Sequence, residues 1–196
     1  MCSQILEMCK ILRIIQSDYS YSSTQVNVED PLRSKILEWS KNNIPDSHLY
    51  TDEENHGRED TPHITILYGI LTQDPEKVKD VLEPEKGPIE VTLGKTSIFE
   101  NSDDYDVVKI GVKSPDLHKL NKLLSDSLDN ENSYPEYKPH VTIAYVKRGK
   151  GKLYSGLDVF EGEALSFDSV RFSDKKENAT TIKLQGTIAA RLNWSV

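Results

Sequence analysis

The 196-residue chain has little cysteine and no long apolar run. Its two cysteines, Cys2 and Cys9, lie in the first ten residues, so they supply neither a disulfide framework nor a zinc-ligand spacing with a histidine. No stretch approaches the roughly 18 consecutive apolar residues that a membrane-spanning helix needs. We therefore expect a cytoplasmic protein that holds no structural metal and crosses no membrane.

Positive charge is also scarce, because the chain has 24 Lys and Arg but 32 Asp and Glu, which gives a formal net charge of −8. Binding to long nucleic acids rests largely on neutralising many phosphates with Lys and Arg. The charge balance therefore argues against a long nucleic acid as partner. A small or end-bound phosphate ligand fits it better.

The length and composition favour one soluble domain. An apolar share of 36% with 29% charged residues is typical of a globular chain, and 196 residues are too few for two ordinary domains. Within residues 1–15, Glu7, Lys10 and Arg13 break the apolar run before it could form a signal-peptide core. We divide the chain into an N-terminal appendage (residues 1–18, helical or disordered), a domain (residues 19–184) and a C-terminal tail (residues 185–196).

Strands and helices are expected to be mixed along the domain. Runs rich in β-branched and aromatic residues predict strands at 19–28, 63–69, 89–99, 106–112, 140–146, 159–172 and 180–184. Three proline signals, Asp30-Pro31, Asp74-Pro75 and Ser114-Pro115, predict helix starts. The polar, acidic stretch at residues 46–60 predicts a mobile surface loop.

One internal repeat stands out within two of these strands. The segments Thr61-Pro62-His63-Ile64-Thr65-Ile66 and Lys138-Pro139-His140-Val141-Thr142-Ile143 match at proline, histidine, threonine and isoleucine, and a tyrosine follows each. Because side chains alternate along a strand, each segment presents its His and Thr together on one face. The same alternation predicts that Tyr68 and Tyr145 lie on the opposite, core face.

Two imidazoles and two hydroxyls in one cleft would suit cleavage of a phosphodiester. One neutral histidine would take a proton from the nucleophile, and the other, protonated, would donate one to the leaving oxygen. The threonine hydroxyls would bind the non-bridging oxygens, whose charge must be stabilised in the transition state. A lone His-x-Thr in a strand is usually structural, but a proline-preceded pair favours catalysis.

At these residues the chain resembles the two-histidine (2H) phosphoesterase superfamily, which is defined by two His-hydrophobic-Thr-hydrophobic motifs. The resemblance covers about residues 19–184. It implies a bilobal α+β fold, in which two pseudo-symmetric lobes with antiparallel sheets flank a central cleft and carry helices outside. It also implies a catalytic set that needs no cofactor or metal: His63, Thr65, His140 and Thr142.

Within that superfamily the chain looks most similar to a phage branch whose enzymes destroy the cyclic-nucleotide signals of bacterial CBASS immunity. The stretches that carry this likeness are Gly57-Arg58-Glu59 and residues 62–70, 93–99 and 137–146. This resemblance implies a small cyclic nucleotide or short oligonucleotide as substrate, in the host cytoplasm if the chain is phage-encoded. RNA-end processing of a 2′,3′-cyclic phosphate or 2′,5′ linkage, and non-catalytic binding of a nucleotide or RNA end, are the alternatives.

Several other residues could take part. His48 and His56 flank the acidic loop, where a metal site with Asp52, Glu53 or Glu54 competes with a solvated loop, and His118 is expected to be exposed on a helix. The basic stretch at residues 147–152 is either a phosphate-contacting loop or a solvated turn. If Val26 and Val28 face the core, the opposite face of their strand lines the cleft with Tyr21, Ser23 and Gln25.

Overall fold

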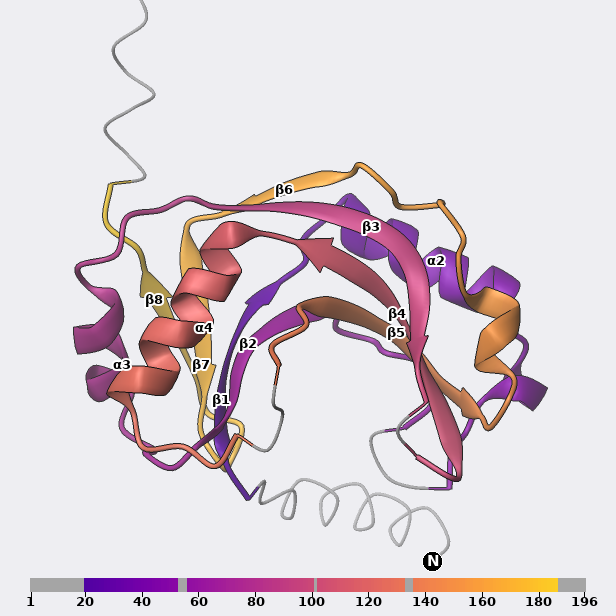
Figure 1. The fold of residues 1–196 in the computed structure, drawn as a ribbon, viewed down its shortest axis with the longest axis horizontal. Coiled ribbons are helices and arrows are strands. Elements are labelled where there is room, and N and C mark those ends of the chain that lie inside the picture. The colour runs from indigo at the N-terminus through magenta and orange to yellow at the C-terminus, as the bar shows by residue number, and fades with distance from the viewer. Residues whose placement is uncertain (1–19, 53–55, 101, 133–135, 187–196) are drawn as a thin grey trace, which may run out of the picture.

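The computed structural model describes residues 20–52, 56–100, 102–132 and 136–186 (Figure 1). The predicted appendage at residues 1–18, with both cysteines, lies outside these ranges, as do residues 187–196 of the predicted tail. None of the helices in the described ranges is long and apolar enough to span a membrane.

Two antiparallel four-stranded sheets form the framework, which confirms the predicted α+β class. The first sheet has the order β2-β1-β7-β8 and contains β1 (Ser22–Asn27), β2 (His63–Ile70), β7 (Ser169–Ser173) and β8 (Ala179–Lys183). The second has the order β5-β4-β3-β6 and contains β3 (Ile89–Phe99), β4 (Tyr105–Lys113), β5 (His140–Lys147) and β6 (Ala164–Phe167).

The predicted strand at residues 159–172 is wrong in its first part. The chain turns at Gly156 and Gly162, where φ is +81° and +87°, and β6 begins only at Ala164. Positive φ is readily adopted by glycine and takes the backbone out of extended geometry. The rest of the run forms two separate strands, β6 and β7, which are divided at Asp168 and belong to different sheets.

Three helices begin close to the predicted proline signals: α2 (Leu32–Asn43), α3 (Pro75–Leu82) and α4 (Pro115–Ser127). The Asp74 carboxylate accepts from Glu76 N at 3.0 Å and the Ser114 hydroxyl accepts from Leu117 N at 3.1 Å, so both act as N-caps. The start of α2 is shifted, since Pro31 takes the cap position and Asp30 accepts from Ser34 N at 3.0 Å.

The strands of the two sheets arch, and the three helices lie on the outer side of the arch (Figure 1). β2 and β5 are edge strands of the two sheets and contact each other, so the sheets meet along them. α4 packs against β2 and β3, α2 packs against β5, and α3 packs against α4 and β8. The buried faces of the two edge strands supply core residues that include Ile64, Ile66, Val141 and Ile143.

A β-bulge interrupts each of these two edge strands at the same point of its motif. Thr24 pairs with Leu67 and Gln25 with Thr65, which leaves Ile66 as an extra residue in β2. Val108 pairs with Ala144 and Lys109 with Thr142, which leaves Ile143 extra in β5. An extra residue reverses the side-chain alternation beyond it.

The bulges overturn the prediction that Tyr68 and Tyr145 are core residues. Leu67 and Ala144 are buried in their place, 1% and 0% exposed. Tyr68 is 43% exposed and Tyr145 is half-buried, and both lie on the same face as the histidine and threonine of their strand.

Candidate functional site

The two histidine motifs lie on the adjacent edge strands where the sheets meet. His63 and His140 are the first residues of β2 and β5, and both are half-buried, as are Thr65 and Thr142. The apolar residue inside each motif, Ile64 or Val141, is fully buried on the opposite face. The structure therefore brings all four predicted residues to the junction of the sheets, facing away from the core.

The same backbone contact holds both imidazoles. His63 Nδ1 lies 2.8 Å from the carbonyl oxygen of Thr61, and His140 Nδ1 lies 2.8 Å from that of Lys138. A carbonyl only accepts, so Nδ1 carries a proton in each ring, and Nε2 of the neutral form is the nitrogen with a free lone pair. Each histidine thus has Nε2 available to exchange a proton with a ligand.

His140 lies in an environment that disfavours its charged form. Burial lowers its pKa below the ordinary 6.5, and the electrostatic effects of Lys109 and His63 lower it further, while the hydrogen bond to the Lys138 carbonyl opposes the shift. The Phe99 ring packs edge-on against the imidazole, with centroids 4.9 Å apart. His140 is therefore mainly neutral at neutral pH and able to accept a proton.

A lysine that sequence reasoning missed lies beside this histidine. Lys109 on β4 is the Cα partner of Thr142 and is only 8% exposed. Its Nζ donates to Ser97 Oγ at 2.8 Å and lies 4.1 Å from the centroid of the Phe99 ring. Because Lys109 stands between the apolar residues Val108 and Ile110, the sequence predicts that it lies on the face of β4 opposite to theirs. Only the pairing register of β4 with β5 shows that it lies beside the second histidine motif.

The first sheet presents amide and guanidinium groups beside the other motif. Asn27 is the Cα partner of His63, Gln25 that of Thr65, and Arg171 on β7 that of Gln25. The side chain of Gln25 donates from Nε2 to Asn27 Oδ1 at 2.7 Å. The prediction that Gln25 opposes a buried face is confirmed, because Val26 is 1% exposed.

A tyrosine pair extends this face along the sheet. The rings of Tyr21 and Tyr68 pack edge-to-face with centroids 5.8 Å apart, and the Tyr21 hydroxyl donates to Glu131. Half-buried Ser23 is the Cα partner of Tyr68. All three predicted residues, Tyr21, Ser23 and Gln25, therefore lie opposite the buried valines of β1.

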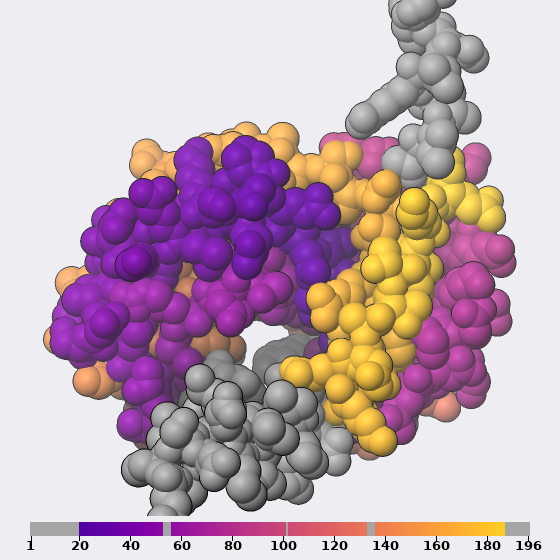
Figure 2. All heavy atoms as spheres, turned by 180° about the vertical axis from the view of Figure 1, so that it is seen from behind, coloured from indigo at the N-terminus to yellow at the C-terminus, as the bar shows by residue number. Residues whose placement is uncertain are grey.

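A groove continues from this face toward β6. Asn27 and Arg171 line one part of it, and residues 163–169 line another. A separate hollow is visible in the space-filling view from behind, between the yellow residues near the C-terminal end and the magenta residues of the first half of the chain (Figure 2). The groove borders the histidine face through Asn27, although neither histidine lines it.

The other histidines have local packing roles. His48 Nδ1 lies 2.6 Å from the Tyr154 hydroxyl, and His118 is exposed, as predicted, with its ring edge-on to Tyr137. The His56 ring packs on Tyr145 at 4.4 Å and on Tyr105 at 4.8 Å, so it belongs to an aromatic cluster and not to a solvated loop.

The acidic stretch at residues 46–60 is paired with a strand at both ends, whereas the sequence predicts a mobile surface loop. Its two ends pair with the free edge of β5, through the bridges Leu49 to Val146 and Arg58 to Ala144. Glu53 and Glu54 lie outside the described residues, and no group of three His, Cys, Asp or Glu within the described ranges could hold a metal ion.

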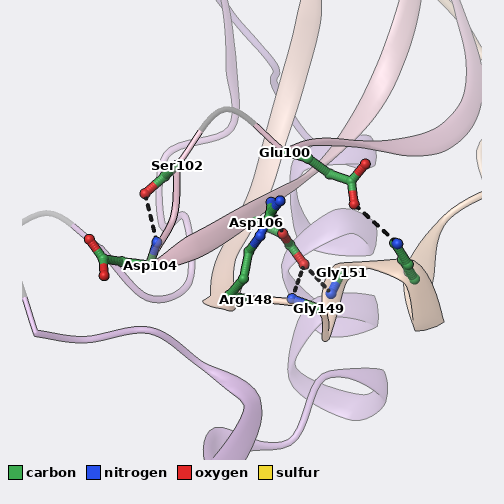
Figure 3. A network of polar contacts seen from close by, with 8 residues as sticks. Glu100, Ser102, Asp104, Asp106, Arg148, Gly149 and Gly151 are labelled. Atoms are coloured by element: carbon green, nitrogen blue, oxygen red, sulfur yellow. Dashed lines mark hydrogen bonds and ion pairs between the residues drawn. The ribbon is translucent and has the colours of Figure 1, made fainter.

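The basic stretch after β5 forms a turn around an internal carboxylate (Figure 3). Asp106 is fully buried and accepts from Arg148 Nη1 at 2.9 Å, Gly149 N at 2.7 Å and Gly151 N at 3.0 Å. A Cβ at Gly151 would lie 2.7 Å from that of Asp106, so glycine is needed there. Of the two interpretations left open by the sequence, the turn fits, because Asp106 already occupies the backbone donors a phosphate would use.

Comparisons with known proteins agree with this architecture. A model of the 2′-5′ RNA ligase superfamily matches residues 30–174, whereas no curated protein sequence matches. The solved structure of TT0787 from Thermus thermophilus is similar with a TM-score of 0.61 and 14% identity, covering 85% of this chain and 99% of that one.

Two further structures share the fold. Usb1 from Kluyveromyces marxianus has a TM-score of 0.56 and 10% identity, covering 86% of this chain and 100% of its own. LigT from E. coli in its apo form has a TM-score of 0.55 and 14% identity, covering 84% of this chain and 94% of its own.

The paired sheets and the two His-x-Thr edge strands define the fold of a two-histidine phosphoesterase. Since the family match spans most of its length, the chain belongs to the 2′-5′ RNA ligase superfamily, a group of phosphoesterases and RNA-ligase-like enzymes.

Proposed function

We propose that this protein is a metal-independent phosphodiesterase that uses His63 and His140 as an acid/base pair. The observation that carries the proposal is the matched presentation of the two imidazoles. Each is held by a 2.8 Å bond from Nδ1 to a carbonyl two residues earlier, which leaves Nε2 for a substrate. Two histidines that served only to pack the core would not need to share one tautomer on two adjacent edge strands.

The environment of His140 favours it as the base. Neutral His140 takes a proton from the attacking water, the new P–O bond forms, and the P–O bond to the leaving oxygen breaks as protonated His63 donates to that oxygen. Thr65 and Thr142 donate to the non-bridging oxygens. Loss of one such donor typically costs on the order of 10²-fold in rate.

The favoured substrate is a small cyclic nucleotide or cyclic oligonucleotide. The net charge of −8 supports a small ligand over a polymeric one. The resemblance to the phage branch, carried by residues 57–59, 62–70, 93–99 and 137–146, supports evasion of bacterial cyclic-nucleotide defence as the biological role.

RNA-end processing is the second candidate, and the comparisons favour it. The family model is that of the 2′-5′ RNA ligase superfamily. E. coli LigT has been solved with 3′-AMP and K. marxianus Usb1 with uridine monophosphate, at TM-scores of 0.53 and 0.55. A 2′,3′-cyclic phosphate or a 2′,5′ linkage would present the same phosphodiester chemistry to the two histidines.

A substrate panel tests the proposal and separates the candidates. The protein is incubated with EDTA and cyclic dinucleotides, cyclic trinucleotides, 2′,3′-cyclic nucleotides or 2′,5′-linked oligonucleotides, and the products are separated by chromatography. Cleavage of cyclic oligonucleotides supports the first candidate, and cleavage confined to the last two supports the second. Tight binding without cleavage of any member would make the protein a binding module and overturn the proposal.

A further inference from the structure

We propose that Lys109, together with Ser97 and Phe99, forms an anion-binding subsite beside His140 and Thr142 that holds the phosphate group of the substrate. This inference deepens the proposed function and rests on it for the identity of the anion. The subsite belongs to one lobe only, so it also sets which way the substrate lies in a nearly symmetric cleft.

Lys109 is a buried cation without a counter-ion in the part of the chain that the structure describes. Its side chain is among the few charged groups in the interior, with 8% exposure, and it forms no ion pair with any residue in the described ranges. Its only polar contact there is the neutral Ser97 hydroxyl, and its remaining partner is the face of the Phe99 ring. Burying an ammonium away from water is costly unless a negative charge is brought to it.

The positive charge of Lys138 adds to the lack of a counter-ion at Lys109. Burial lowers the pKa of Lys109, and the charge of Lys138 lowers it further, so both causes disfavour the ammonium form in the free protein. A bound phosphate would supply the opposite charge and stabilise that form. The ligand group that this subsite needs is therefore an anion.

The position of Lys109 connects it to the reacting residues. As the Cα partner of Thr142, it projects from the same face of the sheet, directly across the β4–β5 ladder. The Phe99 ring bridges the two groups, because it lies under Lys109 Nζ at 4.1 Å and packs edge-on to His140 at 4.9 Å. A phosphate bonded to the Thr142 hydroxyl would lie within reach of the ammonium.

The first sheet carries a neutral residue at the position that matches Lys109. The place across the ladder from Thr65 is held by Gln25, which donates to Asn27. The two motifs therefore differ in the residue that faces each threonine. We expect the charged oxygens of the phosphate to lie toward Thr142 and Lys109, with the leaving group toward His63.

Binding measurements on full-length protein test this subsite without requiring turnover. Titration calorimetry compares wild type with Lys109→Met, an uncharged chain of similar length, using 3′-AMP and 3′-UMP, with adenosine and uridine as ligands that lack phosphate. Loss of one partner of a buried charge pair predicts at least about a 30-fold weaker affinity for the nucleotides. Affinity for the nucleosides should not change.

Lys77→Met is the matched control. Lys77 is exposed on α3, which packs against α4 and β8, so this variant makes the same change of charge away from the cleft and should bind as wild type does. Thermal unfolding without ligand gives a second readout, because removing an unpaired buried charge should leave Tm unchanged or raise it. Lys109→Gln replaces Lys109→Met in these measurements if the methionine variant misfolds.

The possible outcomes separate this inference from the proposed function. Equal nucleotide affinity in wild type and Lys109→Met, or no binding of either nucleotide by wild type at millimolar concentration, overturns the subsite. A Lys109-dependent affinity in a protein that cleaves nothing leaves the subsite standing and removes the enzymatic proposal. A large fall in Tm with an equal loss of nucleoside binding would assign Lys109 a structural role and also overturn it.

Discussion

At the scale of single residues, the two histidines share a backbone contact and differ in what surrounds them. Both use Nδ1 to hold a carbonyl two residues earlier. His140 alone has Phe99 of β3 and Lys109 of β4 beside it. The sequence repeat therefore produces matched positions, and the neighbours that break the symmetry assign different roles to them.

The lowered pKa of His140 predicts where activity falls in acid. The groups that act on His140 are Lys109 on β4, His63 on β2 and the backbone of Lys138. Since the base must be neutral, the acidic limb of kcat/KM reports its pKa, and we expect that limb below the ordinary histidine value of 6.5. Lys109→Met removes one cause of the shift, so the limb should move up toward 6.5.

A pH–rate profile of both proteins, at constant ionic strength, checks this expectation. Because burial, the largest cause, remains in the variant, the limb should move only part of the way. An acidic limb above 6.5 in wild type would contradict the assignment of His140 as base. A limb that does not move in Lys109→Met would contradict the coupling between the two side chains.

The catalytic candidates could be predicted from sequence, but their neighbours could not. His63 and His140 stand out because a rare residue type recurs in the same local pattern. Lys109 has no such pattern, and its proximity to Thr142 depends on a register shift between β4 and β5. Strand register is set by long-range pairing, so residues that meet across a ladder are hidden from local patterns.

At the scale of elements, the bulges in β2 and β5 decide which side chains lie on the histidine face. They turn Tyr68 toward the histidine face and leave Leu67 in the core. We therefore expect Tyr68→Ala to lower the free energy of unfolding by about 1 kcal/mol or less, as for other surface substitutions. Loss of a buried aromatic side chain would cost about 3–5 kcal/mol.

Urea denaturation monitored by circular dichroism measures this difference. Ile66→Ala is the control on the same strand, because Ile66 is fully buried and its truncation should cost about 2–5 kcal/mol. If Tyr68→Ala proves as destabilising as Ile66→Ala, the bulge does not direct Tyr68 outward and the face assignment fails.

Asp106 gives an independent test of the turn after β5. Its carboxylate satisfies Gly149 N, Gly151 N and the Arg148 guanidinium while fully buried. Asp106→Ala leaves these donors without a partner and should reduce the free energy of unfolding by about 3–5 kcal/mol. The exposed Asp103 is the matched control, and its alanine variant should differ from wild type by about 0.5 kcal/mol or less.

Chemical denaturation of the two variants decides the question. Equal stability of Asp106→Ala and Asp103→Ala would show that water hydrogen-bonds the backbone donors of the turn in place of the carboxylate, and would make a phosphate-binding role for that backbone possible again.

The helix starts at Asp74-Pro75 and Ser114-Pro115 could be predicted because their signals are local. The bulges and the Asp106 turn could not, since both depend on partners far along the chain.

At the scale of the whole molecule, the helices connect the two sheets. α2 follows β1 of the first sheet and packs against β5 of the second. α4 follows β4 of the second sheet and packs against β2 of the first as well as against β3 of the second. Each motif strand is therefore supported by the helix of the other half. This crossing supports both edge strands from outside their own sheets, and no local pattern in the sequence predicts it.

The central claim is that both histidines act together in phosphodiester cleavage, and single-residue variants test it most directly. The rate of cleavage of the best substrate in the panel is measured with EDTA for wild type, His63→Ala and His140→Ala, with circular dichroism to confirm folding. We predict that each folded variant loses the general acid or base contribution, a fall of about 10²- to 10⁴-fold. Full activity in either variant would contradict the two-histidine mechanism.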